Sequence, residues 1–217
     1  RDDTHYLHAN LSLADSPEEM ALSVEVTGNE LADMGGQMHV ELPHADYSEL
    51  FHRQTLEDLS IGEMFGGGHF WLTFVGGELS EFTSELELDT LALLSSASDS
   101  LSLRDLSGRV GLVRQSFDDS WELSLSDMRL TWQELRWSPF NVSMSLKPEN
   151  SLAVRADSID VSLIAQFAVS SGLLSESARL QLEQYAPRGK LENFSILLPL
   201  TENSQEHMLI RTNLNNV

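Results

Sequence analysis

Apolar and polar residues alternate one by one through most of this chain. The segment FTSELEL at residues 82–88 is the clearest case, because its large apolar residues take one parity while its glutamates take the other. Successive side chains of a β-strand point to opposite faces of the sheet, so a period of two predicts strands with one apolar and one charged face. A mostly β fold is therefore expected.

The alternation returns in many segments that are separated by short links. The links contain Gly, Asp, Ser or Pro, as at Gly76–Gly77, 116–120 and 148–150, and these residues favour tight turns. Consecutive strands joined by short turns pair antiparallel, so we expect a long antiparallel meander. The segments with the strand pattern are 7–13, 20–26, 38–42, 70–74, 82–93, 101–112, 121–132, 140–146 and 152–154.

Breaks in the alternation predict local irregularities. The parity changes at Asp89–Thr90, which favours a bulge or a bend within one strand. In LSLRDLSGRVGLVR (101–114) we expect a turn near Ser107–Gly108. In SWELSLSDMRLTW (120–132) we expect a second hairpin turn after Ser126–Asp127.

Two stretches depart from the strand pattern. Residues 47–59 favour a short helix or a loop insertion. Apolar residues between about 159 and 186 recur at helical spacing, which predicts two helices with a break at Ser171–Gly172 and an end at Pro187 and Gly189. Strands are expected to return afterwards, in KLENFSILLPL and EHMLIRT, before a polar tail.

The whole chain, residues 1–217, is interpreted as one β-rich segment of a larger protein. It starts at Arg1 rather than at a methionine, which indicates a processed product or an excised piece, and no signal peptide is visible. The expected parts are 1–60 (strands and a short insertion), 61–155 (strand meander), 156–188 (helical segment) and 189–217 (returning strands).

Composition excludes several classes of protein. The net charge of -21 and the pI of about 4.4 argue against nucleic acid and against an anionic membrane surface as partners. The absence of cysteine excludes disulfides, thiolate catalysis and cysteine zinc sites. The longest apolar runs fall far below the roughly 18 residues that a membrane-spanning helix needs.

No arrangement of residues predicts catalysis, a metal site or a cofactor. His5 and His8 are three residues apart, but no third ligand lies near them in the sequence. The glycines of GEMFGGGHF (62–70) lack the Lys-Ser/Thr of a phosphate-binding loop and predict a strand entry or a bulge before Phe70. The carboxylates are numerous and regularly spaced, as on a solvated strand face, so none is singled out as a catalytic pair.

The four tryptophans allow two interpretations. Trp71, Trp121, Trp132 and Trp137 are compatible with a platform on which sugars stack. The alternative, which we favour, is that Trp121 and Trp132 lie at inward parity and pack into the apolar face.

Five segments, taken in order, carry a resemblance to a known family. They are GGGHFWLTFVGGELSEFTSELELDTLAL, LRDLSGRVGLVR, SWELSLSDMRLTW, DSIDVSLIAQFAVSSGLL and LEQYAPRGKLENFSILL. Each motif alone is typical of strands and turns, but their order and spacing over residues 62–198 are more specific. On these motifs the chain resembles the YhdP-like branch of the AsmA superfamily, large bacterial envelope proteins related to TamB.

The resemblance implies an elongated antiparallel sheet that curls, like a taco or an open barrel, around an apolar groove. It also implies a parent protein that is anchored in the inner membrane, crosses the periplasm and carries phospholipid between the inner and outer membranes. The expected partners are phospholipid acyl chains and the remainder of the parent chain. No enzyme activity is expected.

Strand parity, combined with this resemblance, selects the residues that are expected to line the groove. The helical pair at about 159–185 is expected to plug or flank it. The groove candidates are Phe70, Leu72, Phe74, Phe82, Leu86, Leu88, Trp121, Leu123, Leu125, Phe140, Val142 and Met144.

Two alternatives remain open from the sequence. A β-sandwich or jelly roll would pack its apolar faces together and leave Trp71 or Trp137 exposed for a glycan or another ligand. A structural spacer would use the strands to hold its shape and would bind nothing.

Overall fold

The computed structural model describes residues 3–12, 18–29, 33–51, 55–56, 59–95, 101–116, 120–147, 151–170, 176–199 and 209–215. Several predicted features lie outside these residues. They are Leu13, most of the link 116–120, the link 148–150, the helix break at Ser171–Gly172, the start of the strand expected in EHMLIRT and the last two residues of the polar tail.

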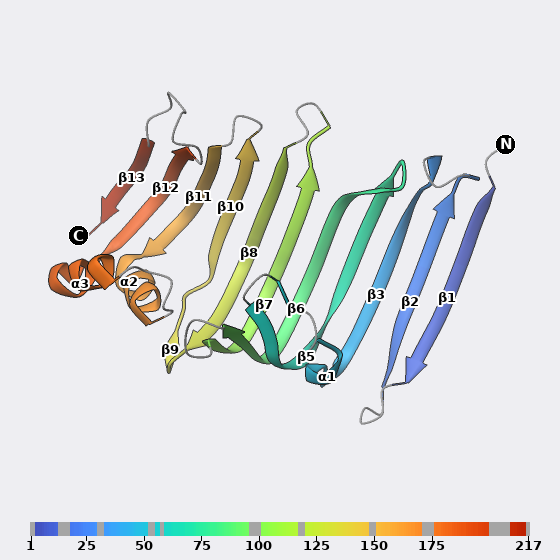
Figure 1. Ribbon diagram of the computed structural model, residues 1–217, viewed down its shortest axis with the longest axis horizontal. Coiled ribbons are helices and arrows are strands. Elements are labelled where there is room, and N and C mark those ends of the chain that lie inside the picture. Colours follow the sequence, from blue (N-terminus) through green and yellow to red (C-terminus); the bar gives the residue numbers. More distant parts are fainter. Residues whose placement is uncertain are drawn as a thin grey trace.

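The chain forms one open antiparallel sheet in which eleven strands follow one another in sequence order, with β4 and β9 paired at its side (Figure 1). This confirms the predicted antiparallel meander. The sheet does not close on itself, and the described residues form no second sheet, so the β-sandwich alternative is wrong. The strands are β1 (Thr4–Ser12), β2 (Glu19–Thr27), β3 (Gly35–Asp46), β4 (Thr55–Leu56), β5 (Leu59–Val75), β6 (Glu78–Ser95), β7 (Leu101–Arg114), β8 (Trp121–Trp132), β9 (Leu135–Arg136), β10 (Phe140–Lys147), β11 (Ser151–Asp160), β12 (Lys190–Pro199) and β13 (Leu209–Asn215).

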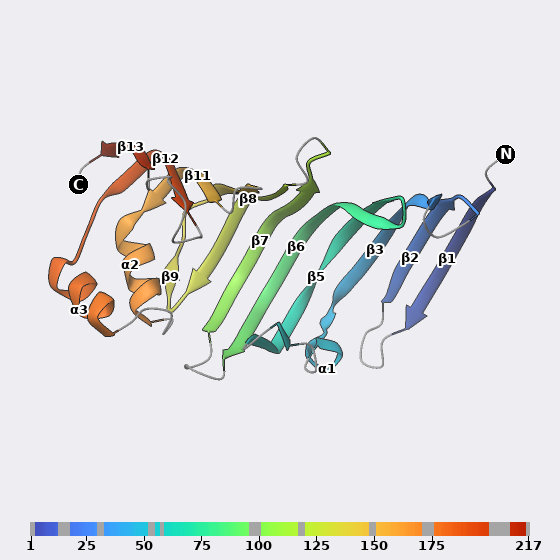
Figure 2. The ribbon, with the colours of Figure 1, turned by 45° about the horizontal axis from the view of Figure 1, so that its top comes forward.

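Three short helices accompany the sheet: α1 (Ser48–Phe51), α2 (Val161–Ser170) and α3 (Glu176–Tyr185). In both views α2 and α3 lie beside the C-terminal strands (Figures 1 and 2). The two predicted helices are thus present. However, β11 continues to Asp160, so the helical segment begins at Val161 rather than at 156 or 159.

The start of α2 has a clear local cause. Asp160 Oδ1 accepts hydrogen bonds from the backbone N–H of Ser162 at 3.0 Å and of Leu163 at 3.2 Å, as an N-cap residue does. The hydrogen bond from the Ser162 hydroxyl is the main cause that lowers the pKa of Asp160, although partial burial opposes it. The chain therefore turns from strand to helix at this carboxylate.

Two predicted turns are wrong. Residues 101–114 form one continuous strand, β7, and residues 121–132 form another, β8. Asp105 and Asp127 have positive φ angles of 50° and 52° inside these strands, and the pairing of β7 with β8 shifts register beside them. Both sites are therefore bulges rather than turns. A bulge was predicted only at Asp89–Thr90 in β6, and it is present there, because the pairing of β5 with β6 skips Asp89.

These bulges lie next to one another across the sheet, on a path that we call the bulge line. We define it by the register shifts at 43–44 in β3, Gly66 in β5, Asp89 in β6, Asp105 in β7, Asp127 in β8 and Asn141 in β10. Bulges bend a strand and increase its twist. Of the glycines of GEMFGGGHF, Gly66 belongs to this line, well inside β5, so of the two predicted alternatives the bulge is present and the strand entry is not.

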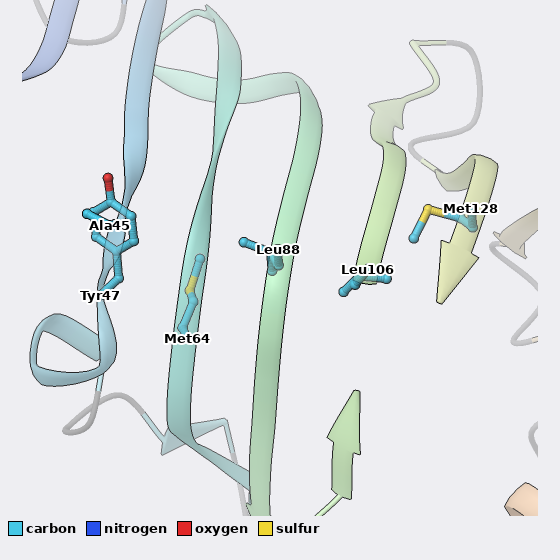
Figure 3. Packing of buried hydrophobic residues seen from close by; sticks show 6 residues of the cluster. All are labelled: Ala45, Tyr47, Met64, Leu88, Leu106 and Met128. Carbon is cyan, nitrogen blue, oxygen red and sulfur yellow. The ribbon is translucent and has the colours of Figure 1, made fainter. Parts of the chain in front are cut away.

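The small buried core lies along the bulge line (Figure 3). Tyr47, which precedes α1, is fully buried, and its hydroxyl donates a hydrogen bond to the Pro43 carbonyl at 2.5 Å. Burial raises the pKa of Tyr47 to about 12, with a smaller contribution from the negative charge of Glu18. The other buried members of this cluster are Ala45, Met64, Leu88, Leu106 and Met128.

Candidate functional site

One row of apolar side chains crosses all eleven strands of the main sheet. Each residue of the row is the register partner of the next, and directly paired residues share a face of the sheet. We call it the central row. Its members are Leu7, Val24, Met38, Leu72, Phe82, Leu112, Leu123, Met144, Val154, Ile196 and Ile210.

A second row runs parallel to it on the same face, two residues further along each strand. The small hydroxyl residue Ser84 is its only polar member, and Ser84 is buried beside the rings of Phe70 and Phe82, whose centroids are 6.3 Å apart. This second row consists of Ala9, Leu22, Val40, Phe70, Ser84, Val110, Leu125, Val142, Ala156 and Phe194.

The two rows form a broad apolar face that is largely uncovered. Most of their side chains are only half-buried, and at the sheet edges Leu7 is 57% and Ile210 is 49% exposed. Among the described residues no second layer covers the centre of this face. A contiguous apolar surface of this kind marks a binding surface for a protein, a membrane or an apolar ligand.

The structure brings all twelve predicted groove residues onto this one face. The central row contains Leu72, Phe82, Leu123 and Met144. The second row contains Phe70, Leu125 and Val142. The remaining five lie on either side: Phe74 opposite Gly36 and Leu79, Trp121 opposite Leu146, Leu86 opposite Gly68 and Gly108, and Leu88 and Phe140 at the bulge line.

The prediction missed the members of the rows in the outer strands. Leu7, Val24 and Met38 already alternate in the sequence, and Val154 and Ile196 do so within short segments. Their parity was therefore a usable signal, but their place in a common row depends on strand register, which parity does not give.

The opposite face is polar and carries three ion pairs. Arg109 Nε lies 2.7 Å from Glu85 Oε1, and Arg104 Nη2 lies 2.5 Å from Glu134 Oε1. His44 Nε2 lies 3.1 Å from the carboxylate of Asp89 at the bulge line. These exposed pairs contribute little to stability, but they show that the charged side chains project away from the apolar rows.

At the rim of the apolar face one cation is neutralised. Arg114 is the register partner of Trp121 and therefore belongs to the apolar side of β7. Its guanidinium pairs with the carboxylate of Glu78 at the start of β6. The charge at this rim is thus compensated beside the apolar rows.

Helix α2 covers one end of the apolar face. The ring of Phe167 packs edge-on against Trp132 at 5.3 Å and against Trp137 at 6.1 Å, and Trp132 is buried. Helix α2 thus flanks the face near β8. The four tryptophans form no common platform, because Trp71 lies on the polar face and Trp132 is inaccessible.

The described part of the chain contains neither a metal-binding cluster nor a membrane-spanning helix. No group of three or more His, Asp or Glu side chains there is placed to hold a metal ion. No helix there is long and apolar enough to cross a membrane.

Comparison with known proteins identifies the family of the chain. The family described as YhdP protein matches residues 1–217, which is the whole chain. No curated protein and no solved structure matched it. The chain therefore belongs to the YhdP family of cell-envelope proteins.

Proposed function

We propose that this chain is a non-enzymatic wall segment of a bridge-like lipid-transfer protein. Its apolar face contacts the acyl chains of phospholipids that move between the inner and outer membranes. The segment lies in the periplasm and belongs to a longer parent protein that is anchored in the inner membrane. Membership of the YhdP family supports a role related to lipid transport.

The observation that carries the proposal is the continuity of the central row. Eleven strands spaced about 4.8 Å apart make the row about 48 Å long. A charge left unpaired against acyl chains would cost several kcal/mol, and the two rows contain no charged residue. Each lipid methylene buried on this face contributes about 0.8 kcal/mol.

The polar face supports the same proposal. With a net charge of -21, the chain has an exterior that stays solvated and is repelled by anionic membrane surfaces. Lipid would therefore meet the segment along its apolar face rather than by adsorption of the outer face.

Site-specific photo-crosslinking in the full-length protein tests the proposal in cells. A photoreactive amino acid replaces Met144 in the central row or, as the matched control, the adjacent Ser143, which the register places on the polar face between Ser124 and Arg155. We expect phospholipid adducts from position 144 and none from position 143. Equal yields of adduct at both positions would contradict a lipid-binding face.

Charge substitutions give a second test with the purified full-length protein. Met144→Glu, Leu86→Glu and Leu123→Glu each place a carboxylate on the apolar face, so co-purifying phospholipid should fall several-fold. Ser143→Glu adds the same charge beside Arg155 on the polar face and should retain the lipid. Lipid binding that survives in folded Leu86→Glu and Leu123→Glu proteins would favour a spacer instead.

A further inference from the structure

The polar face carries a cavity of about 770 Å³ over the N-terminal strands β1, β2, β3, β5 and β6. Its floor is formed by the segments around Leu7, Val24, Met38 and Leu72, whose side chains point to the opposite, apolar face. The cavity is therefore separated from the apolar rows by the thickness of the sheet, and the proposed lipid path does not use it.

The walls of the cavity come from two neighbouring rows of the polar face. One row supplies Tyr6, Glu25, Gln37, Thr73 and Glu81. The other supplies His8, Ser23, His39, Trp71 and Thr83.

An aromatic cluster forms one side of the cavity. The ring of Trp71 stacks on His39 with centroids 5.1 Å apart and an interplanar angle of 16°. His69, two residues before Trp71, lies 5.7 Å from each of these rings and nearly parallel to both. Trp71 nevertheless remains 38% exposed and lines the cavity, so part of its indole ring is accessible to a ligand there.

The polar groups of the cavity are mostly acceptors or amphoteric groups. Glu25 and Glu81 provide two carboxylates, Gln37 an amide, and Thr73 and Thr83 hydroxyls, while the cavity lining includes no Lys or Arg. This set disfavours phosphate and other anions, which need cationic partners. It suits a ligand with several hydroxyl donors.

One polar atom at this site lacks a partner. Nε2 of His39 is buried and forms no hydrogen bond within the described structure. Buried polar atoms in native proteins usually have a partner, so such an atom next to a cavity needs an explanation. If this ring rotated towards a ligand hydroxyl, Nε2 could form a hydrogen bond with the ligand without breaking an existing one.

We propose that this cavity binds a neutral saccharide, which stacks on the Trp71 cluster and donates hydroxyl hydrogen bonds to Glu25 and Glu81. An organic amine would also find carboxylates here. However, amines are recognised by rings arranged around a point charge, whereas the rings of this cluster are nearly parallel. An extended flat surface fits the apolar face of a sugar ring.

Ligand-observed NMR with the purified full-length protein tests this proposal. The probes are the tetramers of N-acetylglucosamine and of glucose, with spermidine as the amine. We expect saturable binding of at least one tetramer, and a loss of at least tenfold in affinity in Trp71→Ala. Trp137→Ala makes the same change outside the cavity, where Trp137 packs against Phe167, and should leave sugar affinity unchanged.

Glu81→Gln is a milder variant that keeps the size of the side chain and removes its charge. It should weaken sugar binding by about three- to tenfold, because hydrogen bonds to charged groups are stronger than neutral ones. If folded wild-type protein binds neither tetramer, or if Trp71→Ala binds as well as wild type, the proposal is wrong. If the protein binds spermidine and neither tetramer, the ligand is an amine and the saccharide proposal is wrong. Lipid content measured on the same samples tests the apolar face separately.

Discussion

The bulge line and the central row lie on the same sheet, yet they bury their side chains to different extents. Leu88 at the bulge line is only 4% exposed, whereas Leu72 in the central row is half-buried and Leu7 at its end is 57% exposed. The core cluster beside the bulge line and the central row both consist of apolar side chains. The core residues beside the bulge line pack against one another and against Tyr47. The side chains of the central row pack only against their partners in the neighbouring strands.

This difference indicates that the two regions have different roles, one in stability and the other in binding. The bulge line holds the fold, because its apolar contacts are satisfied within the chain. The central row retains unsatisfied apolar surface, which a ligand can cover. Substitutions in the first region should therefore change stability, and substitutions in the second should change binding.

The largest expected effect comes from truncating a buried leucine. Leu88→Ala should lower the free energy of unfolding by about 2–5 kcal/mol, because it leaves a cavity in the core cluster. Leu72→Ala removes the same atoms from a half-buried site and should cost about 1 kcal/mol. Urea unfolding of lipid-free protein measures both. Equal losses would show that the central row is as much a core as the bulge line.

Two glycines, Gly66 at the bulge line and Gly35 in β3, allow the same comparison for the backbone. Gly66 has a φ of 142°, and a Cβ there would lie 2.5 Å from the Leu88 Cα and collide with the Glu87 carbonyl. Gly66→Ala should therefore destabilise by about 2 kcal/mol or more. Gly35→Ala in β3 meets only ordinary contact at 3.6 Å and should change the melting temperature little. A tolerated Gly66→Ala would mean that the bulge is not required.

A smaller effect is expected on the polar side of the bulge line. Asn141 accepts a hydrogen bond from the Asp127 backbone at 2.8 Å and donates one to Asp157 at 2.8 Å, so it connects three strands. Asn141→Ala should cost about 1–2 kcal/mol. Ser143→Ala, two residues along the same face of β10, should cost less than half of that. Thermal unfolding of the two variants measures both losses. A larger loss of stability in Ser143→Ala than in Asn141→Ala would contradict the role given to Asn141.

The smallest effect tests the buried hydroxyl of Tyr47. Tyr47→Phe loses the hydrogen bond to Pro43 and should cost about 0.5–1.5 kcal/mol at neutral pH. The pKa of Tyr47 is about 12 in the folded protein against an ordinary 10.0, so its contribution is complete below pH 10 and is lost as the pH rises towards 12.

Unfolding measured from pH 8 to pH 11 should therefore show the wild-type and Tyr47→Phe stabilities converging above pH 10. Tyr6→Phe is the matched control for the loss of a tyrosine hydroxyl, because Tyr6 is 76% exposed. A Tyr47→Phe curve that stays parallel to that of the wild type would show that Tyr47 ionises as readily in the folded protein as in the unfolded one.

Much of the fold was predictable because each strand carries its own alternation. The misinterpreted sites are instructive, since the same signal, a change of parity at an aspartate, occurs at Asp89, Asp105 and Asp127. Ser107–Gly108 and Ser126–Asp127 have turn-forming residues, which favoured hairpins. Glycine inside a strand also marks a bulge, and only the pairing with neighbouring strands decides between the two.

The sites were less predictable than the fold. Parity assigned each of the twelve groove candidates to one face of its own strand, but it did not show that these faces join or that the rows continue through the outer strands. Trp71 was named as a candidate for sugar stacking, but its cluster with His39 and His69 was missed, because it forms only when β3 pairs with β5 in the observed register. Register is set by the bulges and turns together, and these are not resolved by local sequence patterns.

The uniformity of the central row has a consequence for motion. Every member is an aliphatic, methionine or phenylalanine side chain, and the pattern repeats at each strand spacing of about 4.8 Å. An acyl chain that moved by one strand would exchange one set of dispersion contacts for a nearly equal one. Its interaction energy would therefore vary little along the row. If the face carries lipid as proposed, it would bind an acyl chain without a preferred position, and the direction of transport would have to be set at the ends of the sheet.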